Sequence, residues 1–234
     1  VEPARSAGVH DLDGDGTPDV LVTNRGAANG FYLNDGTGRF GPKQDFGSES
    51  GSTIAVAVAD VNLDGHQDLV LANRDGQGNR ILLGSESHAF RESVPFGSGS
   101  DETRAVAAAD MNGDGHVDVI SANIGEPNGV YFGDSTGAFD EGVTFGGDNG
   151  SYSLVVRDLD LDGDADLVVG NADTRNAVYL NDGSGRTFEQ IWVGDEDETT
   201  YGVAVGDLDG DGYPEIVLAN SGGLNRFFFN RSAN

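Results

Sequence analysis

The stretch HDLDGDGTPDVLVTN, residues 10–24, places four aspartates within nine residues, directly before an apolar run. Carboxylates this close together repel one another, by about 1 kcal/mol per pair at ~4 Å even in water. Oxygen side chains at alternating positions converge on one point when the backbone wraps around it, and this is how proteins bind hard cations such as Ca²⁺. A cation-binding loop would therefore make the crowding tolerable.

The same nine-residue pattern occurs four more times. It reads DVNLDGHQD, DMNGDGHVD, DLDLDGDAD and DLDGDGYPE, with successive starts 49, 50, 48 and 49 residues apart. The five loops contain 19 of the 40 acidic residues of the chain. One such loop could be an ordinary Asx-rich turn on a solvated hairpin. Five loops in register, each with glycine at position 6, favour a metal site in each repeat.

We predict one Ca²⁺ per repeat, about five in all. Side chains at positions 1, 3, 5 and 9 would supply oxygens, and position 7, whose side chain varies freely, would supply its backbone carbonyl. The predicted metal-binding residues are Asp11, Asp13, Asp15, Thr17 and Asp19; Asp60, Asn62, Asp64, His66 and Asp68; Asp110, Asn112, Asp114, His116 and Asp118; Asp158, Asp160, Asp162, Asp164 and Asp166; and Asp207, Asp209, Asp211, Tyr213 and Glu215.

The residues present argue against two other kinds of metal site. An EF-hand needs a bidentate Glu at position 12 of the loop, between flanking helices. Position 12 here is Val22, Leu71, Ser121, Val169 or Leu218, inside an expected strand. A zinc site is disfavoured because the chain has no cysteine and its four histidines are not clustered.

The whole unit repeats, not only the loop. A small apolar run precedes each loop, a strand-like run ending in Asn follows it, and a second Asn comes five or six residues later. Four strands per ~49 residues are typical of a β-propeller blade. We therefore predict an all-β fold, a single β-propeller domain over residues 1–234. Its five four-stranded blades cover approximately residues 4–49, 50–99, 100–149, 150–198 and 199–234, with a calcium loop in each blade.

The outer strand of each blade carries a second regularity. Phenylalanines six residues apart bracket this strand in the first three units, at Phe40 and Phe46, Phe90 and Phe96, and Phe139 and Phe145. Six is an even step, so both rings of a pair are expected on one face of the strand. The fifth unit stops at FFFNRSAN. The last blade is therefore expected to lack its outer strand.

The pattern D-x-[DN]-x-D-G-x-x-[DE] at this spacing resembles the FG-GAP/VCBS repeat family. The segments LVTN and YLNDGTGRF, and the FG pairs at residues 46–47, 96–97 and 145–146, are also similar to that family, although no literal GAP triplet occurs. The resemblance covers essentially the whole chain. It implies a calcium-stapled propeller, as in integrin α-subunit heads and in fungal and bacterial lectins. Those propellers commonly have seven blades, whereas five units are visible here.

The net charge and composition limit the classes of binding partner that the protein can have. The formal net charge of −27 argues against nucleic acid and against anionic membrane surfaces as partners. No apolar run is long enough to insert into a membrane. Calcium sites of the weak extracellular kind, with Kd around 10⁻⁴–10⁻³ M, fill only outside cells. We therefore expect a secreted or cell-surface protein, and the sequence leaves its oligomeric state open.

Three functions are compatible with such a propeller. The first is a lectin-like, carbohydrate-binding module, because near-uniform units suit several equivalent weak sites for a small ligand. Asn pairs, Tyr32, Tyr131, Tyr179 and Trp192 could contact sugars, but they could equally form turns and core, so we assign no ligand site. The second is a protein-binding or adhesion scaffold, or an accessory domain of a larger secreted protein.

The third function, a hydrolase or lyase, is disfavoured by the residues. His10, His66, His88 and His116 form no evident catalytic group, and no nucleophile motif is present. We therefore predict a protein that is not an enzyme and assign no catalytic residue.

Overall fold

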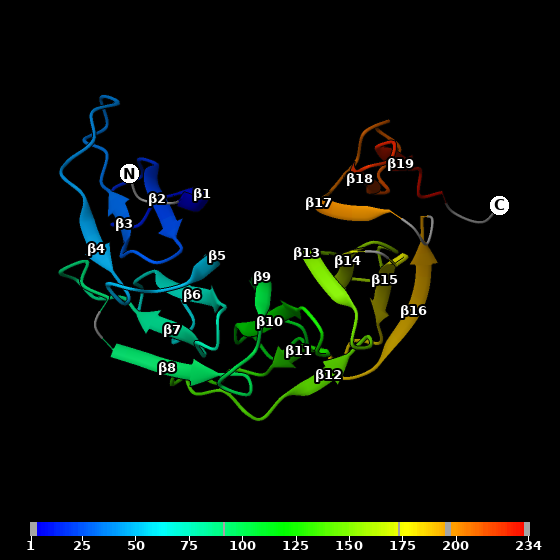
Figure 1. Cartoon of the computed structure of the whole chain (residues 1–234), viewed down its shortest axis with the longest axis horizontal. Helices are drawn as coiled ribbons and strands as arrows, with labels where there is room; N and C mark the ends of the chain where they lie inside the picture. The colour runs from blue at the N-terminus through cyan, green and yellow to red at the C-terminus, as the bar shows by residue number, and fades with distance from the viewer. Residues whose placement is uncertain (1–3, 91, 173, 195–197, 232–234) are drawn as a thin grey trace.

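The computed structural model of the chain describes residues 4–90, 92–172, 174–194 and 198–231 (Figure 1). These residues form five antiparallel sheets and no helix. None of their segments is a helix that could cross a membrane. The predicted all-β propeller with five blades is confirmed.

Each sheet is a meander in which successive strands pair. The first four sheets have four strands each, and the fifth has three among the described residues. The strands are β1 (Ala4–His10), β2 (Asp19–Asn24), β3 (Asn29–Tyr32) and β4 (Gln44–Phe46); β5 (Thr53–Ala59), β6 (Asp68–Asn73), β7 (Asn79–Leu83) and β8 (Glu92–Phe96); β9 (Thr103–Ala109), β10 (Asp118–Asn123), β11 (Asn128–Tyr131) and β12 (Val143–Phe145); β13 (Gly150–Arg157), β14 (Asp166–Ala172), β15 (Asn176–Asn181) and β16 (Phe188–Val193); and β17 (Thr199–Gly206), β18 (Glu215–Ser221) and β19 (Arg226–Phe228).

The five blades form an open arc, with β1, β5, β9, β13 and β17 on its inner side (Figure 1). Each of these inner strands contacts the inner strand of the next blade. The first and last blades face each other across the opening of the arc (Figure 1). The five described sheets therefore do not form a closed ring.

Burial along the second strands explains how the blades hold together. Every residue of β6 and β10 is buried, because neighbouring blades cover both faces of these strands. In β2, Leu21 is buried while Val20 and Val22 on the other face are only half-buried. In the last blade Phe227 is 61% exposed. The first and the last blade thus each expose an apolar sheet face, whereas the equivalent faces of the internal blades are buried.

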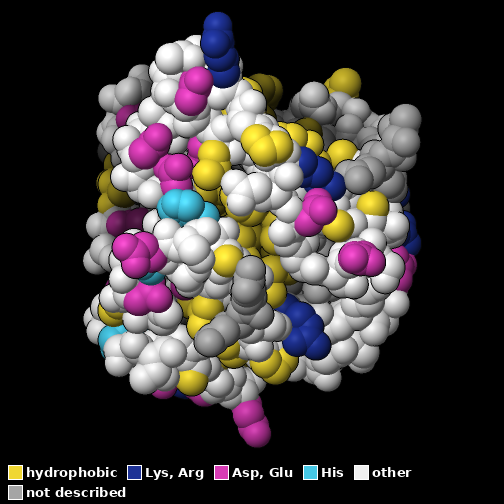
Figure 2. Space-filling view, turned by 90° about the vertical axis from the view of Figure 1, so that its left-hand side faces the viewer, with side chains coloured by type: hydrophobic (Ala, Val, Ile, Leu, Met, Phe, Trp, Pro, Cys, Tyr) yellow, Lys and Arg dark blue, Asp and Glu magenta, His cyan; other side chains and the backbone are white. Residues whose placement is uncertain are grey.

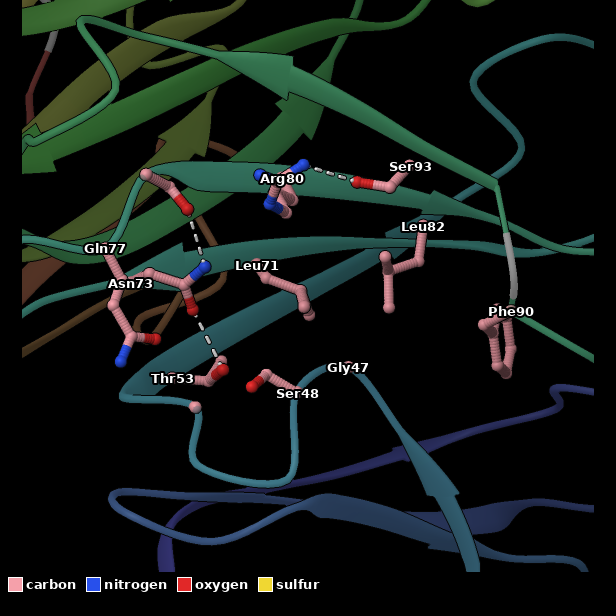
Figure 3. A pocket seen from close by; sticks show the side chains of 12 residues that line it. Gly47, Ser48, Thr53, Leu71, Asn73, Gln77, Arg80, Leu82, Phe90 and Ser93 are labelled. Carbon is pink, nitrogen blue, oxygen red and sulfur yellow. Dashed lines mark hydrogen bonds between the residues drawn. The ribbon is translucent and has the colours of Figure 1, made fainter.

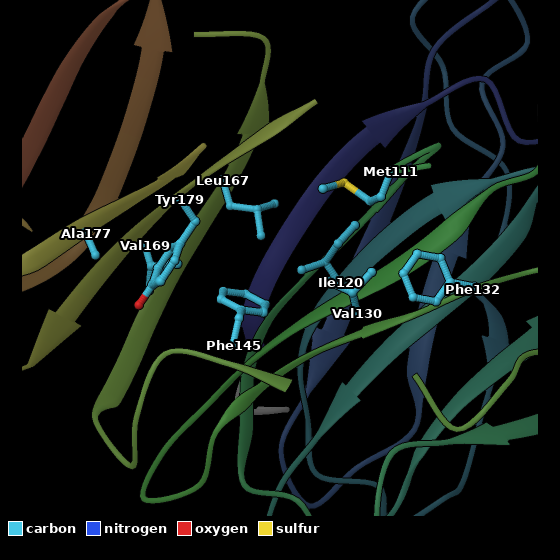
Figure 4. Close-up of a cluster of buried hydrophobic side chains, with 9 residues drawn as sticks. All are labelled: Met111, Ile120, Val130, Phe132, Phe145, Leu167, Val169, Ala177 and Tyr179. Atoms are coloured by element: carbon cyan, nitrogen blue, oxygen red, sulfur yellow. The ribbon is translucent and has the colours of Figure 1, made fainter. Parts of the chain in front are cut away.

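The cores are the junctions between blades, not the interiors of single sheets. Figure 4 shows the junction of the third and fourth blades. The third blade contributes Met111, Ile120, Val130, Phe132 and Phe145, which pack against Leu167, Val169, Ala177 and Tyr179 of the fourth blade. The other three junctions have the same construction. A blade is one sheet, and a sheet can bury its apolar faces only against its neighbours.

The prediction that paired outer-strand phenylalanines share a face is wrong. Phe90 packs in the junction of the first and second blades, whereas Phe96 packs in the next junction. Phe139 and Phe145 are divided in the same way, and Phe40 is 49% exposed while Phe46 is buried. β4, β8 and β12 begin after the first ring of each pair, so strand alternation does not extend back to it.

Hydrogen bonds between buried side chains also link the first blade to the second and the second to the third. Asn79 Nδ2 donates a hydrogen bond to Thr103 Oγ1 of the following blade (2.7 Å), which in turn donates to Asn123 Oδ1 (2.8 Å). Asn29, Thr53 and Asn73 make the same connection one blade earlier. Within each blade the second Asn accepts a hydrogen bond from the backbone N–H of the first. The Asn pairs are therefore turn and junction residues.

We expect Thr103→Val to lower the free energy of unfolding by about 2–3 kcal/mol. Valine has nearly the same shape but leaves the Asn79 amide and the Asn123 carbonyl oxygen buried without this partner, at ~1–3 kcal/mol for each such group. Urea unfolding would measure the change. Thr136→Val is the matched control, since Thr136 bonds Asp134 in an exposed turn, and its effect should stay within about 0.5 kcal/mol. Equal losses in the two variants would contradict this account.

Candidate metal centres

Each acidic loop joins the innermost strand of a blade to the second strand and is folded by its own carboxylates. The position-1 aspartate accepts the N–H of the position-6 glycine in all five loops, at 2.8–3.1 Å. This glycine has φ between 86° and 101° in every loop, a conformation that residues with a Cβ rarely adopt. The backbone therefore curls around the position-1 carboxylate.

Position 5 closes the second half of the loop. Its carboxylate accepts the N–H of position 7 in all five loops, at 2.7–2.9 Å. The pKa of Asp15 lies below its usual value because of the hydrogen bonds from Thr17, and that of Asp114 does so chiefly because of the His116 N–H. These carboxylates are exposed, so their remaining lone pairs are available to a cation.

Position 9 is different, because it is completely buried in every loop. In the first four loops its carboxylate accepts two backbone N–H groups, one from position 2 and one from beside the end of the third strand. Burial raises the pKa of Asp68, Asp118 and Asp166. These aspartates therefore fasten the loop to the sheet, a role that spacing in the sequence does not reveal.

The structure brings carboxylate oxygens together in three loops. In each of these, one oxygen per residue lies within 4.8 Å of the others, for Asp11, Asp13 and Asp15; Asp158, Asp160 and Asp166; and Asp207, Asp209 and Glu215. In the second and third loops position 3 is Asn62 or Asn112, whose amide donates to the position-5 carboxylate at 3.0 Å. An amide thus replaces one carboxylate there.

The fifth loop contains a buried carboxylate oxygen that no described residue bonds. Glu215 Oε2 accepts the Leu208 N–H at 2.6 Å, but Oε1 is buried without a hydrogen bond among the described residues. Its counterparts in the other loops accept the N–H of Asn34, Gly84, Gly133 or Asn181. A buried carboxylate oxygen without a partner is costly unless a cation or another donor satisfies it. Since Glu215 belongs to the cluster with Asp207 and Asp209, its free oxygen fits a cation site.

The donor set fits calcium. The side-chain groups that converge in these three loops are carboxylate oxygens, which suit a hard cation that accepts 6–8 oxygen ligands. The side chain of Thr17 is already engaged, donating to Asp15 and to the Asn34 carbonyl. At position 7 the backbone carbonyl therefore remains the predicted ligand, as the varying side chains suggested. His116 Nδ1 is buried without a partner among the described residues.

Acidic and histidine side chains gather toward one side of the face seen in Figure 2. His66 and His116 both belong to acidic loops, at position 7. Because the loops occupy the same place in every blade, their charge is concentrated on one side of the arc. That concentration is what a row of bound cations would offset.

A sequence model described as the FG-GAP-like repeat matches residues 11–71, 60–121, 110–169 and 158–218. These four overlapping matches cover most of the chain. No curated protein sequence matches it significantly.

Solved structures share the fold at low sequence identity. BBS1N, solved in complex with ARL6DN, is 13% identical with a TM-score of 0.63, over 99% of this chain and 67% of that one. The Dos1 propeller is 11% identical with a TM-score of 0.61, over 93% and 53%. An exo-β-1,3-galactanase from Phanerochaete chrysosporium, solved with β-1,3-galactotriose, is 9% identical with a TM-score of 0.57, over 97% and 60%. The chain thus spans about half to two-thirds of the lengths of these proteins.

The galactanases correct one prediction from the sequence. Near-uniform repeats and the lack of a catalytic motif led to the prediction that the protein is not an enzyme. Exo-β-1,3-galactanase from Phanerochaete chrysosporium and its putative counterpart from Bifidobacterium bifidum s17, both about 10% identical to this chain, have the same fold. Since enzymes are built on this architecture, the prediction is contradicted.

Proposed function

Because this chain belongs to the FG-GAP-like repeat family, we propose that it is a calcium-stabilised propeller module that recognises an extracellular carbohydrate. The observation that carries the calcium part is the acidic loop, repeated five times in register, with a buried Glu215 oxygen in the fifth that has no hydrogen-bond partner in the described part of the chain. Calcium would be held by the side chains at positions 1, 3, 5 and 9. When bound, it would neutralise carboxylates that otherwise repel one another.

A pocket of about 480 Å³ between the first and second blades supports the carbohydrate part (Figure 3). Leu71, Leu82 and Phe90 provide an apolar wall. Polar groups lie beside them on the same sheet, among which Arg80 Nη1 donates to Ser93 Oγ at 2.9 Å. Pockets of ~300–1,000 Å³ with a few placed polar groups are typical of small-ligand sites. A sugar combines an apolar C–H face with hydroxyl groups, which matches this lining.

Screening the protein on a glycan array, with millimolar calcium and in parallel with chelator, tests this proposal. We expect calcium-dependent binding that Arg80→Ala weakens by about tenfold, because a hydrogen bond to a charged group contributes ~1.5–3 kcal/mol. Arg39→Ala is the control, since Arg39 is exposed and does not line the pocket. Binding that both variants reduce equally would place the ligand elsewhere.

If the folded, calcium-loaded protein binds no glycan on the array, the proposal that its ligand is a carbohydrate is wrong. The next candidate is then a protein ligand, because BBS1N, which shares the fold, was solved in complex with the protein ARL6DN. An extracellular location is part of the proposal in both cases, since weak calcium sites fill there.

A further inference from the structure

A pocket of about 670 Å³ lies in the junction of the second and third blades. It occupies the same place in the repeat as the pocket of Figure 3, which belongs to the preceding junction. Gly97 and Asn123 line it where Gly47 and Asn73 line the other. Both walls of the pocket come from internal blades, so its shape is independent of the two ends of the arc.

Three positions of the repeat differ between the two pockets in a way that reverses their charge. Arg80 lines the first pocket, whereas none of the described residues that line the second is Lys, Arg or His. The three positions hold Gly51, Gln77 and Arg80 at the first junction and Asp101, Glu126 and Gly129 at the second.

Asp101 and Glu126 form a carboxyl pair in the second pocket. Asp101 is 4% exposed, and its carboxylate accepts the N–H of Ser98 at 2.7 Å and the Ser98 hydroxyl at 2.6 Å. The pKa of Glu126 lies above its usual value, first because of its hydrogen bond with the Asp101 side chain and then because of burial. Asp140, also in the lining, pairs with Arg186 at 3.0 Å, but no Lys or Arg among the described residues bonds Asp101 or Glu126. Two carboxyl groups this close share a proton, because like charges disfavour ionisation of both.

An aromatic wall lies beside this carboxyl pair. The Tyr131 ring lies across Gly129, since a Cβ added to that glycine would be 2.6 Å from the Tyr131 hydroxyl oxygen. The ring packs edge-on against Phe96 at 5.5 Å between centroids. A Cβ added to Gly97 would lie 2.1 Å from Asp101 Oδ2 and 3.4 Å from the Tyr131 hydroxyl oxygen, so the carboxylate and the phenol meet at this glycine. Aromatic rings attract organic cations as well as apolar groups.

Ser121 adds a buried hydroxyl on the pocket side of β10. It lies on the same strand face as Asn123, which lines the pocket. Ser121 is completely buried near the Tyr131 hydroxyl, but its Oγ has no hydrogen bond to that group or to any other described residue. The first pocket has Leu71 at this position. A buried hydroxyl without a partner is costly, and a ligand that brings hydrogen-bond donors would satisfy it.

We propose that this pocket binds the primary ammonium group of a small organic ligand, which Asp101 and Glu126 hold as hydrogen-bond acceptors. An ammonium group carries three N–H donors, and its charge replaces the proton that the two carboxyl groups share. The face of Tyr131 would cover the adjoining carbon atoms. A metal ion fits less well, because calcium needs 6–8 oxygen ligands and the aromatic wall supplies none.

Such a group occurs on amino sugars and on alkylamines that resemble a lysine side chain. Titration of the isotope-labelled, calcium-loaded protein, followed by the NMR shifts of its backbone amides, tests both sources. We expect saturable binding of glucosamine and of n-butylamine, with shifts at Gly97, Asp101 and Glu126. N-acetylglucosamine has the same sugar ring without the charge and should bind at least about tenfold more weakly. Tighter binding of glucosamine than of n-butylamine would identify an amino sugar as the ligand class, and the reverse order an alkylamine.

Protein variants locate the site. Glu126→Gln introduces the residue that the first pocket has at this position, and it should weaken the binding of both amines at least about tenfold. Glu49→Gln is the matched control, since Glu49 is exposed in the corresponding loop one blade earlier and lines neither pocket. It removes the same charge and should leave the affinity unchanged. The amide spectra also show whether each variant is folded.

Three results would overturn the proposal. Equal affinity for N-acetylglucosamine would show that the charge is not recognised. Equal weakening by Glu126→Gln and Glu49→Gln would show only a general attraction of cations to a chain of net charge −27. Displacement of the amines by excess calcium at constant ionic strength would make the pocket a metal site. Arg80→Ala should leave amine binding unchanged because Arg80 lines the other pocket, so this proposal and the proposed function fail independently.

Discussion

Chelating calcium is expected to lower the melting temperature of this protein by at least about 10 °C relative to the protein in 5 mM calcium. A site with Kd of ~10⁻⁴–10⁻³ M stabilises the folded state by about 1–2 kcal/mol at that concentration, because the unfolded chain does not assemble it. Five such sites would contribute about 5–10 kcal/mol. In a protein of this size, 1 kcal/mol shifts the melting temperature by ~2–4 °C.

The reason for so large an effect is the concentration of negative charge in the loops. Asp158, Asp160, Asp162, Asp164 and Asp166 lie within nine residues, and the structure shows no Lys or Arg bonded to them among the described residues. Without a cation, the carboxylates of a loop repel one another. This repulsion opposes the folded loop conformation that the hydrogen bonds to the position-1 and position-5 carboxylates maintain. With one, the same carboxylates become ligands.

Differential scanning calorimetry with and without chelator measures the shift, and titration calorimetry measures the stoichiometry, expected to be about five. Magnesium at the same concentration is the control for general screening, since it demands stricter octahedral geometry and should restore only part of the stability. A melting temperature that does not respond to the chelator would contradict structural calcium in every loop.

The repeat made most of the architecture predictable. Periodic loops and apolar runs give the five sheets and the order of their strands, because each repeat unit must fold in the same way. The paired phenylalanines do not share a face, because Phe90 and Phe139 precede their strands and side chains alternate regularly only within a strand. The length of a strand depends on pairing with its neighbour, and spacing alone does not specify it.

The sequence predicts those parts of the candidate metal sites whose hydrogen bonds lie within a single loop. Positions 1, 3 and 5 bond within their own loop, so the sequence pattern contains them completely. Position 9 bonds the backbone beside the third strand, about 15 residues away, as Asp118 does with Gly133. Thr103 joins two blades through Asn79 and Asn123. Contacts of this kind arise from the pairing of strands and the stacking of blades, which no local motif encodes.

Asp118→Ala is expected to destabilise the protein even when calcium is absent, by about 2–4 kcal/mol. The Asp118 carboxylate accepts the Met111 N–H at 2.8 Å and the Gly133 N–H at 3.0 Å in a fully buried position. Its removal leaves two buried donors unpaired, at ~1–3 kcal/mol each. Relief of repulsion with Asp110 and Asp114 offsets part of this, but only at about 1 kcal/mol per pair. The loss of hydrogen bonds therefore exceeds the gain.

Asp114→Ala separates the two roles of the loop. Asp114 is exposed and bonds chiefly the His116 N–H and the Asn112 amide, so its removal should cost less than about 1 kcal/mol in chelator. In calcium the same variant should lose one bound ion and the stabilisation that this ion provides. Urea unfolding of both variants, with calcium and with chelator, distinguishes these expectations. If Asp118→Ala were destabilising only in calcium, position 9 would act as a metal ligand alone, and the two backbone hydrogen bonds would not hold the loop to the sheet.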